Sequence, residues 1–361
     1  MAITWANGIN GMLSEADWID FPFNPSRPNE PIDTLFIDEQ SDNLKAKWAS
    51  IASEQLVPKM AKYHAFDTES NKTYRPTITN NEIEKGLIKV KINTSESLLE
   101  AIQNNVTKPE SLVDYVLNDA RNLAEQVKTR TLVAKYEIMA TGKVTIGENY
   151  LSETIDFGVS ASQKAYTIDL SNNSDIFATF EQIIDAAKKK GVIISGMMTS
   201  RTNITKMRQN SKVQIAINGS IGSGATVKRS TFDDYLATEF GITSIIEADG
   251  LYNPDNEALD GSTSQPVIST LRYYPENKIT FFATMPNGRL GSGLWGVPPA
   301  VLNKMISAQA STDGRYIYID QWTEHDPDVL WTRASGVFIP ILINPDSLYI
   351  ATVLPAASDE A

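Results

Sequence analysis

Side chains suited to acid–base or metal chemistry are scarce in this chain of 361 residues, which has two histidines and no cysteine. Without cysteine, disulfides, thiolate catalysis and cysteine-ligated zinc are excluded. Histidine is the commonest general base and a frequent metal ligand, and it occurs only at His64 and His325. The 44 acidic residues allow many arbitrary carboxylate pairs, so no single pair is informative.

The stretch Glu324-His-Asp-Pro-Asp328 brings His325 together with three carboxylates. Such a cluster suits a metal site or a base held by an orienting carboxylate. A histidine flanked by acids before a proline is more often a surface turn, and we interpret it so. The GxSxG nucleophile elbow and the HExxH zinc helix are both absent from the sequence.

Two glycine-rich stretches resemble phosphate-binding motifs. Gly291-Ser-Gly-Leu-Trp-Gly296 spells GxGxxG, but Pro298 and Pro299 follow where a dinucleotide site needs a helix. Gly219 to Gly224 resembles half of a phosphate loop, yet Ala225 stands in place of the lysine. We interpret both stretches as flexible loops. We therefore predict no catalytic, cofactor-binding or metal residue, no cofactor and no enzymatic activity.

Composition limits the partners of the chain. The net charge is −12 and the pI is near 4.8, so no broad basic footprint for nucleic acid exists. The longest apolar run, Val337–Ile343, is too short to span a bilayer and contains a proline, so we predict no membrane partner. A hydrophobic content of 42% suffices for two packed domains or one large domain with extensions.

One long helix, Pro109 to Thr141, is the strongest structural signal. Thr107 and Glu110 form a capping box, and Gly142 follows as a helix stop. At 1.5 Å per residue the helix would be about 50 Å long. Spacings of four and three place a narrow stripe of mostly small residues on one face: Val113, Leu117, Ala120, Ala124, Val127, Thr131, Ala134 and Ile138. Such a stripe leaves room for a sheet or helix to pack closely.

The segments before this helix look extended. Prolines at every third position from Pro22 to Pro31 favour a polyproline-like arm. This arm docks on a neighbour, serves as a PxxP ligand or tethers to its own domain; the sequence leaves all three open. Residues 53–95 carry a long polar loop that ends in a half-exposed strand at Leu87–Ile92.

Helices and strands alternate after residue 175, which predicts a small α/β domain. The expected helices are Ile176–Lys190, Ser200–Gln209 and Phe232–Phe240, and the expected strands are Val192–Met198, Ile242–Glu247 and Lys278–Ala283. The chain then returns to strands over 316–354.

This order of parts resembles the major capsid protein of tailed double-stranded-DNA phages, in particular the lambda-type coat-protein family. The likeness rests on four stretches: Glu324-His-Asp-Pro327 with Trp331, Ala334 and Ser335; Phe338–Ser347 with Ala351-Thr-Val353; Gly191–Ser195; and Phe281–Arg289. The resemblance implies an α+β fold of the Hong Kong 97 type. It implies an N-terminal arm (1–52), an extended loop (53–95), a peripheral domain (96–174) with a spine helix at 109–141, an axial domain (175–310), and peripheral strands with a C-terminal tail (311–361).

The same resemblance implies a function. Subunits would form hexamers and pentamers that close an icosahedral head shell around double-stranded DNA, without sequence-specific binding. The expected location is the virion, after assembly in the host cytoplasm. Expected partners are the chain itself, a separate scaffolding protein, a portal at one vertex and, as an option, a decoration protein. Lys72, Lys85, Lys89 and Lys91 lie in the loop region, but none is assigned a crosslinking role.

Two alternatives remain open from the sequence. One is another virion part, such as a tail tube or connector. The other is an α/β enzyme that binds a small ligand at the glycine-rich region 287–296. In the capsid interpretation, Gly222, Gly224, Gly291 and Gly293 would let loops adapt to pentamer and hexamer surroundings.

Overall fold

The computed structural model describes residues 30–41, 43–51, 57, 59–70, 72–73, 78–94, 110–148, 151–220, 226–254, 270–302, 309–310, 316–325 and 328–354.

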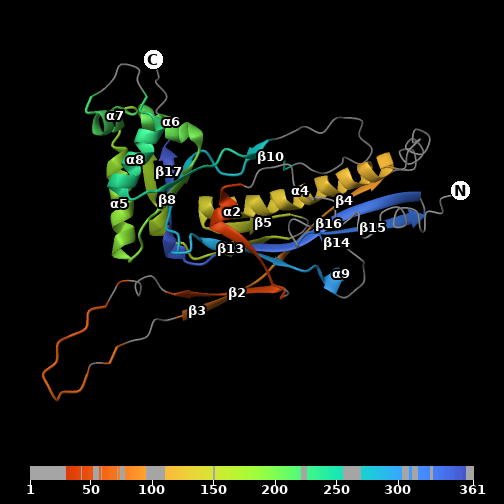
Figure 1. Cartoon of the computed structure of the whole chain (residues 1–361), viewed down its shortest axis with the longest axis horizontal. Coiled ribbons are helices and arrows are strands. Elements are labelled where there is room, and N and C mark those ends of the chain that lie inside the picture. Colours follow the sequence, from red (N-terminus) through yellow and green to blue (C-terminus); the bar gives the residue numbers. More distant parts are fainter. Residues whose placement is uncertain are drawn as a thin grey trace.

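Helix α4 (Glu110–Thr141) lies along a long sheet, and a helical unit stands at one end of the molecule (Figure 1). The 32 residues of α4 include no glycine or proline that would interrupt the helix. Gly142, at a φ of +73°, ends the helix by donating its N–H to the Ile138 carbonyl.

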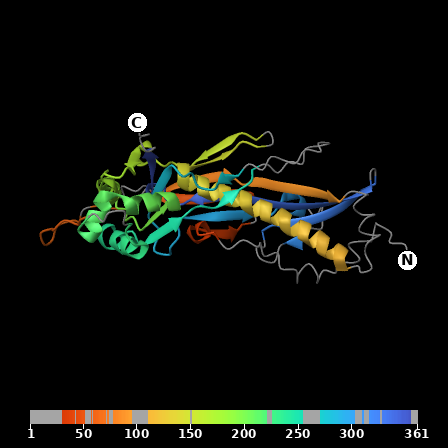
Figure 2. The ribbon, with the colours of Figure 1, turned by 90° about the horizontal axis from the view of Figure 1, so that it is seen from above.

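The long sheet is built around one strand of 15 residues, β16. The order along the sheet is β1-β13-β16-β15-β14, and β4 pairs with the other edge of β16. The bounds are β1 (Phe36–Gln40), β4 (Gly86–Thr94), β13 (Gly291–Gly296), β14 (Gln309–Ala310), β15 (Tyr318–His325) and β16 (Asp328–Leu342). Figure 2 shows α4 crossing this sheet obliquely.

The helical unit contains a second sheet, of order β7-β17-β12-β8-β9. Its strands are β7 (Tyr166–Asp169), β8 (Gly196–Thr199), β9 (Ser244–Glu247), β12 (Lys278–Phe282) and β17 (Leu348–Leu354). Its helices are α5 (Ile176–Lys189), α6 (Arg201–Gln209), α7 (Ser211–Asn218) and α8 (Arg229–Phe240). Helices α5, α6 and α7 each begin after a residue whose side chain accepts a hydrogen bond from a backbone N–H of the first turn. These N-cap residues are Asp175, Ser200 and Asn210.

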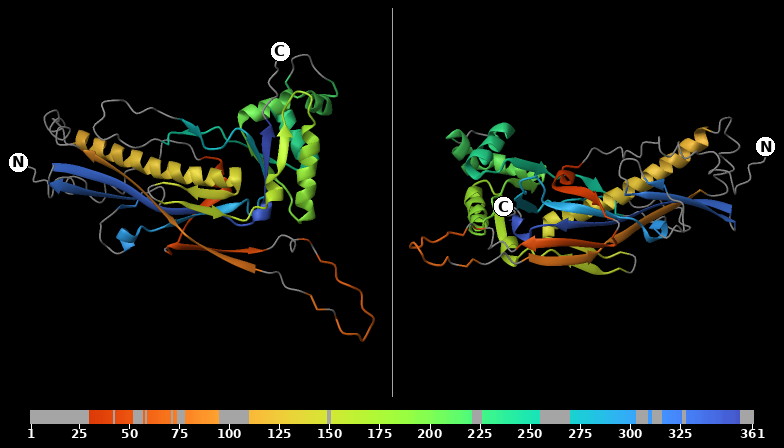
Figure 3. Two further views of the ribbon diagram at one scale, coloured as in Figure 1. Left: turned by 180° about the vertical axis from the view of Figure 1, so that it is seen from behind. Right: turned by 60° about the horizontal axis from the view of Figure 1, so that its bottom comes forward.

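A two-stranded hairpin, β2 (Lys45–Ile51) and β3 (Ile78–Glu84), projects away from both sheets (Figure 3). Smaller pieces complete the fold: α2 (Ile32–Leu35), β5 (Lys143–Ile146), β6 (Glu153–Asp156), η2 (Ala161–Lys164), β10 (Leu251–Tyr252), β11 (Leu271–Arg272), α9 (Pro299–Leu302) and η3 (Pro345–Ser347). The predicted α+β class is confirmed.

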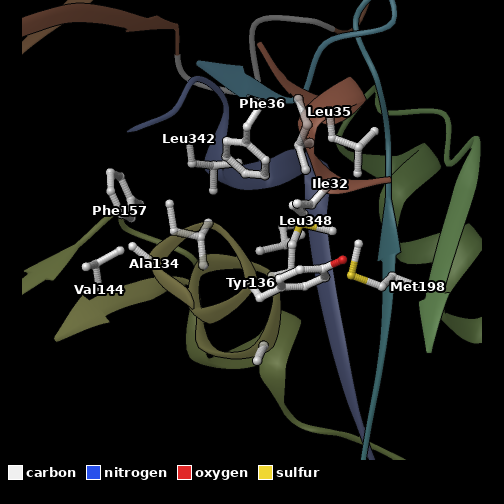
Figure 4. Close-up of a cluster of buried hydrophobic side chains, with 14 of the residues drawn as sticks. Ile32, Leu35, Phe36, Ala134, Tyr136, Val144, Phe157, Met198, Leu342 and Leu348 are labelled. Carbon is white, nitrogen blue, oxygen red and sulfur yellow. The ribbon is translucent and has the colours of Figure 1, made fainter. Parts of the chain in front are cut away.

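The buried stripe of α4 is confirmed over its described part. Ala120, Ala124 and Val127 pack on Trp295, Ala334 and Phe338 of the long sheet. The C-terminal end of the helix is buried more widely, in a core that includes Ile32 and Phe36 (Figure 4). The capping box at Thr107 and the side chains of Val113 and Leu117 lie outside the described residues.

Three predicted placements differ from the structure. The predicted arm, residues 1–52, contains β1, which pairs with β13 in the long sheet, and β2, which pairs with β3 in the hairpin. Strand β17 was expected with the peripheral strands, but it pairs with β12 and β7 in the sheet of the helical unit. Strand β13 was expected as a loop of the α/β domain, but it pairs with β1 and β16 in the long sheet. These differences arise because the pairing partners lie far apart in the sequence, where local patterns give no information.

Candidate functional site

The buried end of α4 carries a lysine that holds the first described segment in place. The Lys135 side chain is 1% exposed, and its Nζ lies 2.7 Å from Asp33 Oδ1 and 2.8 Å from Asp38 Oδ1. A buried ammonium is tolerated only with such partners. The neighbouring Tyr136 hydroxyl donates to Glu30 Oε2 at 3.1 Å. Residues 30–38 are therefore fastened to α4 by charge as well as by apolar packing.

The electrostatics of this cluster follow from its burial. Burial raises the pKa of Asp38, and the positive charge of Lys135 opposes that rise. Burial and the nearby Glu30 carboxylate raise the pKa of Tyr136, so its hydroxyl stays a neutral donor. We interpret the cluster as structural, because Lys135 and Tyr136 are paired with carboxylates of the segment that they hold in place.

A second buried lysine fixes the base of the projecting hairpin. Lys85 stands between β3 and β4, and its Nζ donates to the Ser41 carbonyl at 2.8 Å and the Trp295 carbonyl at 3.0 Å. Its backbone N–H donates to the Leu44 carbonyl at 3.0 Å. One residue therefore ties both arms of the hairpin to the ends of β1 and β13.

The tip of the hairpin offers large apolar side chains to solvent. Met60, Tyr63 and Phe66 are 89%, 107% and 100% exposed, and all described residues from 59 to 70 are exposed. Apolar groups gathered in this way mark an interaction surface. The hairpin arms carry surface ion pairs from Lys45 and Lys47 to Glu82, which suit a ribbon surrounded by water.

The GxGxxG stretch is a buried central strand, so the predicted flexible loop is wrong there. A Cβ on Gly291 would meet the Phe36 ring and the Ile341 carbonyl, and one on Gly293 would meet Asp38 and Phe338. These glycines allow close packing between strands. The helix that follows, α9, has only four residues and begins at Pro299, which has no backbone N–H, so it offers no N-terminus suited to a dinucleotide phosphate.

The other motif candidates are dispersed. His325 pairs with Asp328 in the backbone register where β15 turns into β16, and the side chains of 325–328 lie outside the described residues. Glu324 accepts a hydrogen bond from Trp331 Nε1 at 2.9 Å. Gly219 ends α7, while Gly222 and Gly224 lie outside the described residues. His64 is exposed and lies in the stretch between β2 and β3. Among the described residues no group of three acids or histidines could hold a metal ion.

Sequence reasoning missed both buried lysines. No motif contains them, and their partners are 102 and 210 residues away in the sequence. A weak signal existed at Lys135, a lone cation in the otherwise apolar stretch Leu132–Tyr136.

None of the helices in the described part of the chain is both long and apolar enough to cross a membrane.

Comparison with known proteins gives one family match. The family model described as phage major capsid protein E matches residues 24–353. No curated protein sequence matches the chain.

Solved structures resemble the chain at low sequence identity. A phage-related protein from Bordetella bronchiseptica RB50 is 11% identical, with a TM-score of 0.51 over 89% of this chain and 90% of that one. The putative capsid protein of a prophage from E. coli CFT073 is 15% identical, with a TM-score of 0.48 over 77% and 80% of the two chains. The capsid of Myoviridae phage XM1 is 12% identical, with a TM-score of 0.47 over 91% and 94%.

Proposed function

The chain belongs to the phage major capsid protein E family, and from that premise we propose how its parts build a shell. It is a major capsid protein of the virion and associates with itself into an icosahedral shell. The predicted Hong Kong 97-type fold is confirmed. As a structural protein, it is proposed to have no catalytic activity.

The exposed hairpin tip is the observation that carries the assembly proposal. A shell subunit must bury surface against several neighbours through heterologous contacts that close on themselves. A seven-residue ribbon that projects from the body, with Tyr63 and Phe66 fully exposed at its end, extends contact area without a larger core. We propose that these contacts form hexamers and pentamers.

The parts of the chain are proposed to have distinct places in the shell. The five-stranded sheet with α5–α8 is the axial domain, at the centre of each capsomer. Helix α4 with the long sheet is the peripheral domain, and the β2–β3 hairpin is the extended loop. The arm was predicted as residues 1–52; we propose that it ends before β1, at the point where the Lys135 cluster holds Asp33.

Partners beyond the chain itself are also proposals. We expect a separate scaffolding protein and a portal at one vertex, with a decoration protein as an option. The enclosed double-stranded DNA is held without reading its sequence, because a net charge of −12 disfavours tight binding to phosphates.

Sedimentation tests the assembly proposal. The purified chain, alone and co-expressed with the scaffolding gene of its phage, should contain fast-sedimenting particles and capsomers of five and six subunits. A monomer that persists at high concentration under both conditions would contradict the proposal.

A further inference from the structure

The base of the β2–β3 hairpin is built around one buried lysine. Lys85 is the single residue between β3 and β4, and it is 4% exposed. Its Nζ donates to the carbonyls of Ser41, directly after β1, and of Trp295, near the end of β13. Its backbone N–H donates to the carbonyl of Leu44, directly before β2. The ends of β1, β2, β3 and β13 therefore meet at this residue.

The end of β13 has a shape that admits the lysine. Gly296 follows Trp295, and a Cβ on Gly296 would lie 3.3 Å from Lys85 Cδ and 3.4 Å from Lys85 Nζ. A side chain at position 296 would therefore crowd the ammonium where it donates to the Trp295 carbonyl. Glycine at this position gives the ammonium its space.

Stability alone does not account for a lysine at this place. Burial of an ammonium costs desolvation free energy, and an apolar side chain of similar volume is often as stable or more so. The Trp295 carbonyl would keep a partner without the ammonium, because the Ser41 N–H also donates to it at 2.9 Å. What the ammonium adds is a set of charge-assisted hydrogen bonds, which have a defined direction.

Apolar side chains also hold the hairpin base on the body. Ala46 of β2 is buried in the same core as Phe157, and Trp48 and Ile83 pack against that core. The centroids of the Trp48 and Phe157 rings are 6.1 Å apart. Because apolar attraction is non-directional, these contacts keep the hairpin on the body but do not by themselves define its angle.

The angle at the base determines where the far end of the hairpin lies. Figure 3 shows the hairpin extending away from the body. The seven residues of β3 span about 23 Å at 3.3 Å per residue. A rotation of about 20° at the base would thus move the far end by about 8 Å, more than the spacing of about 4.8 Å between paired strands. A displacement of this size would misplace every contact that the far end makes.

We propose that Lys85 is a positioning residue for assembly, whose ammonium fixes the direction of the hairpin in the free subunit, before any neighbour binds. This inference rests on the proposed assembly function and adds the residue that prepares the hairpin for it. A segment that already has its bound direction loses less conformational entropy on association. The buried lysine then serves the shell more than it serves the stability of the subunit.

Distances between two spin labels in the unassembled subunit test the fixed direction, because the chain has no cysteine of its own. Ala49→Cys on β2 and Asn122→Cys on α4 place the labels at exposed positions of regular structure. We expect one narrow distance distribution, which Lys85→Met broadens by several ångströms. Lys45→Met is the matched control, because it removes an exposed ammonium from the same hairpin and should leave the distribution unchanged. An unchanged distribution in Lys85→Met would overturn the proposal.

A measurement on the unsubstituted subunit covers the case in which Lys85→Met does not fold. The backbone N–H groups of Lys85 and Ser41 donate to Leu44 and Trp295 at the hairpin base. If the base is fixed in the free subunit, their hydrogen exchange should be as slow as that of β13. Exchange at the rate of the exposed residues 59–70 would overturn the proposal.

Particle yield separates this proposal from the shell function. At equal concentration, Lys85→Met should lose most of the closed particles that Lys45→Met forms, with an unfolding temperature close to that of the unsubstituted protein. Equal yields from the two variants would overturn the positioning role and leave the shell function intact. Absence of particles from the unsubstituted protein would instead overturn the shell function, while the label distances would still test the fixed direction.

Discussion

Lys135 and Asp33 lie 102 residues apart in the sequence, yet the Nζ of Lys135 on α4 and the Oδ1 of Asp33 on α2 are 2.7 Å apart. Asp38 shares the same ammonium at 2.8 Å. Helix α4 therefore holds residues 30–38 in place through Lys135. Strand β1, which begins at Phe36, starts within this held segment.

Replacing Lys135 with methionine should strongly destabilise the subunit. The substitution keeps the apolar stem and leaves two partly buried carboxylates without their counter-charge, which costs about 3 kcal/mol. Denaturant unfolding of the disassembled subunit measures this loss. Lys143→Met is the matched control, because the Lys143 side chain is 41% exposed and its ion pair with Asp156 contributes at most about 1 kcal/mol. Equal effects of the two substitutions would contradict the role of the buried cluster.

Gly293→Val should disrupt the long sheet and not a ligand site. Its side chain would collide with Asp38 and Phe338, at a cost of about 2 to 3 kcal/mol in unfolding free energy. Gly147→Val serves as control, because a Cβ there meets nothing within 4 Å. Nucleotides should leave the thermal unfolding of the unsubstituted protein unchanged. A nucleotide-dependent shift that Gly293→Val abolishes would revive the enzyme alternative.

Ala124→Trp should block assembly while leaving the helical unit folded. Ala124 is buried against the long sheet, so an indole there must separate α4 from Trp295 and Phe338. Electron micrographs report assembly, and circular dichroism reports the retained helices. Asn122→Trp places the same side chain on an exposed position of α4. Normal shells from Ala124→Trp would refute the packing of α4 against this sheet.

The contribution of Asp156 should depend on pH. A hydrogen bond from Lys143 is the main cause of a lowered pKa for Asp156 in the folded state. Because this pKa is lower in the folded than in the unfolded chain, the ionised Asp156 stabilises the fold at pH values above the unfolded-state pKa of about 3.9. This stabilisation disappears as the pH falls through the folded-state pKa. Asp156→Asn should therefore lower stability at pH 7 by less than about 1 kcal/mol. The difference should shrink below pH 4, and a difference that grows with acid would contradict this sign.

The helices were the most predictable part of the fold. Caps and breakers are local, so α4 begins within one residue of its predicted start, and Asp175, Ser200 and Gly142 set further ends correctly. Helix α7 was missed because its short apolar pattern merges with the glycine-rich stretch after Asn218. Its N-cap, Asn210, was a usable signal.

The arrangement of the strands and the buried lysines could not be predicted in the same way. The glycines of β13 resemble a loop until Phe36 is known to pack against Gly291 and Phe338 against Gly293. Likewise, Lys85 looks like an ordinary loop lysine until the carbonyls of Ser41 and Trp295 meet at its Nζ. Such contacts are set by the tertiary fold, which overrides local preference.

Electron microscopy of the purified, assembled protein tests the central claim most directly. The account predicts closed shells with icosahedral symmetry, in which six- and five-fold capsomers place the helical unit at their centres. Rings or open tubes would indicate a connector or tail-tube protein, and either result would contradict the account.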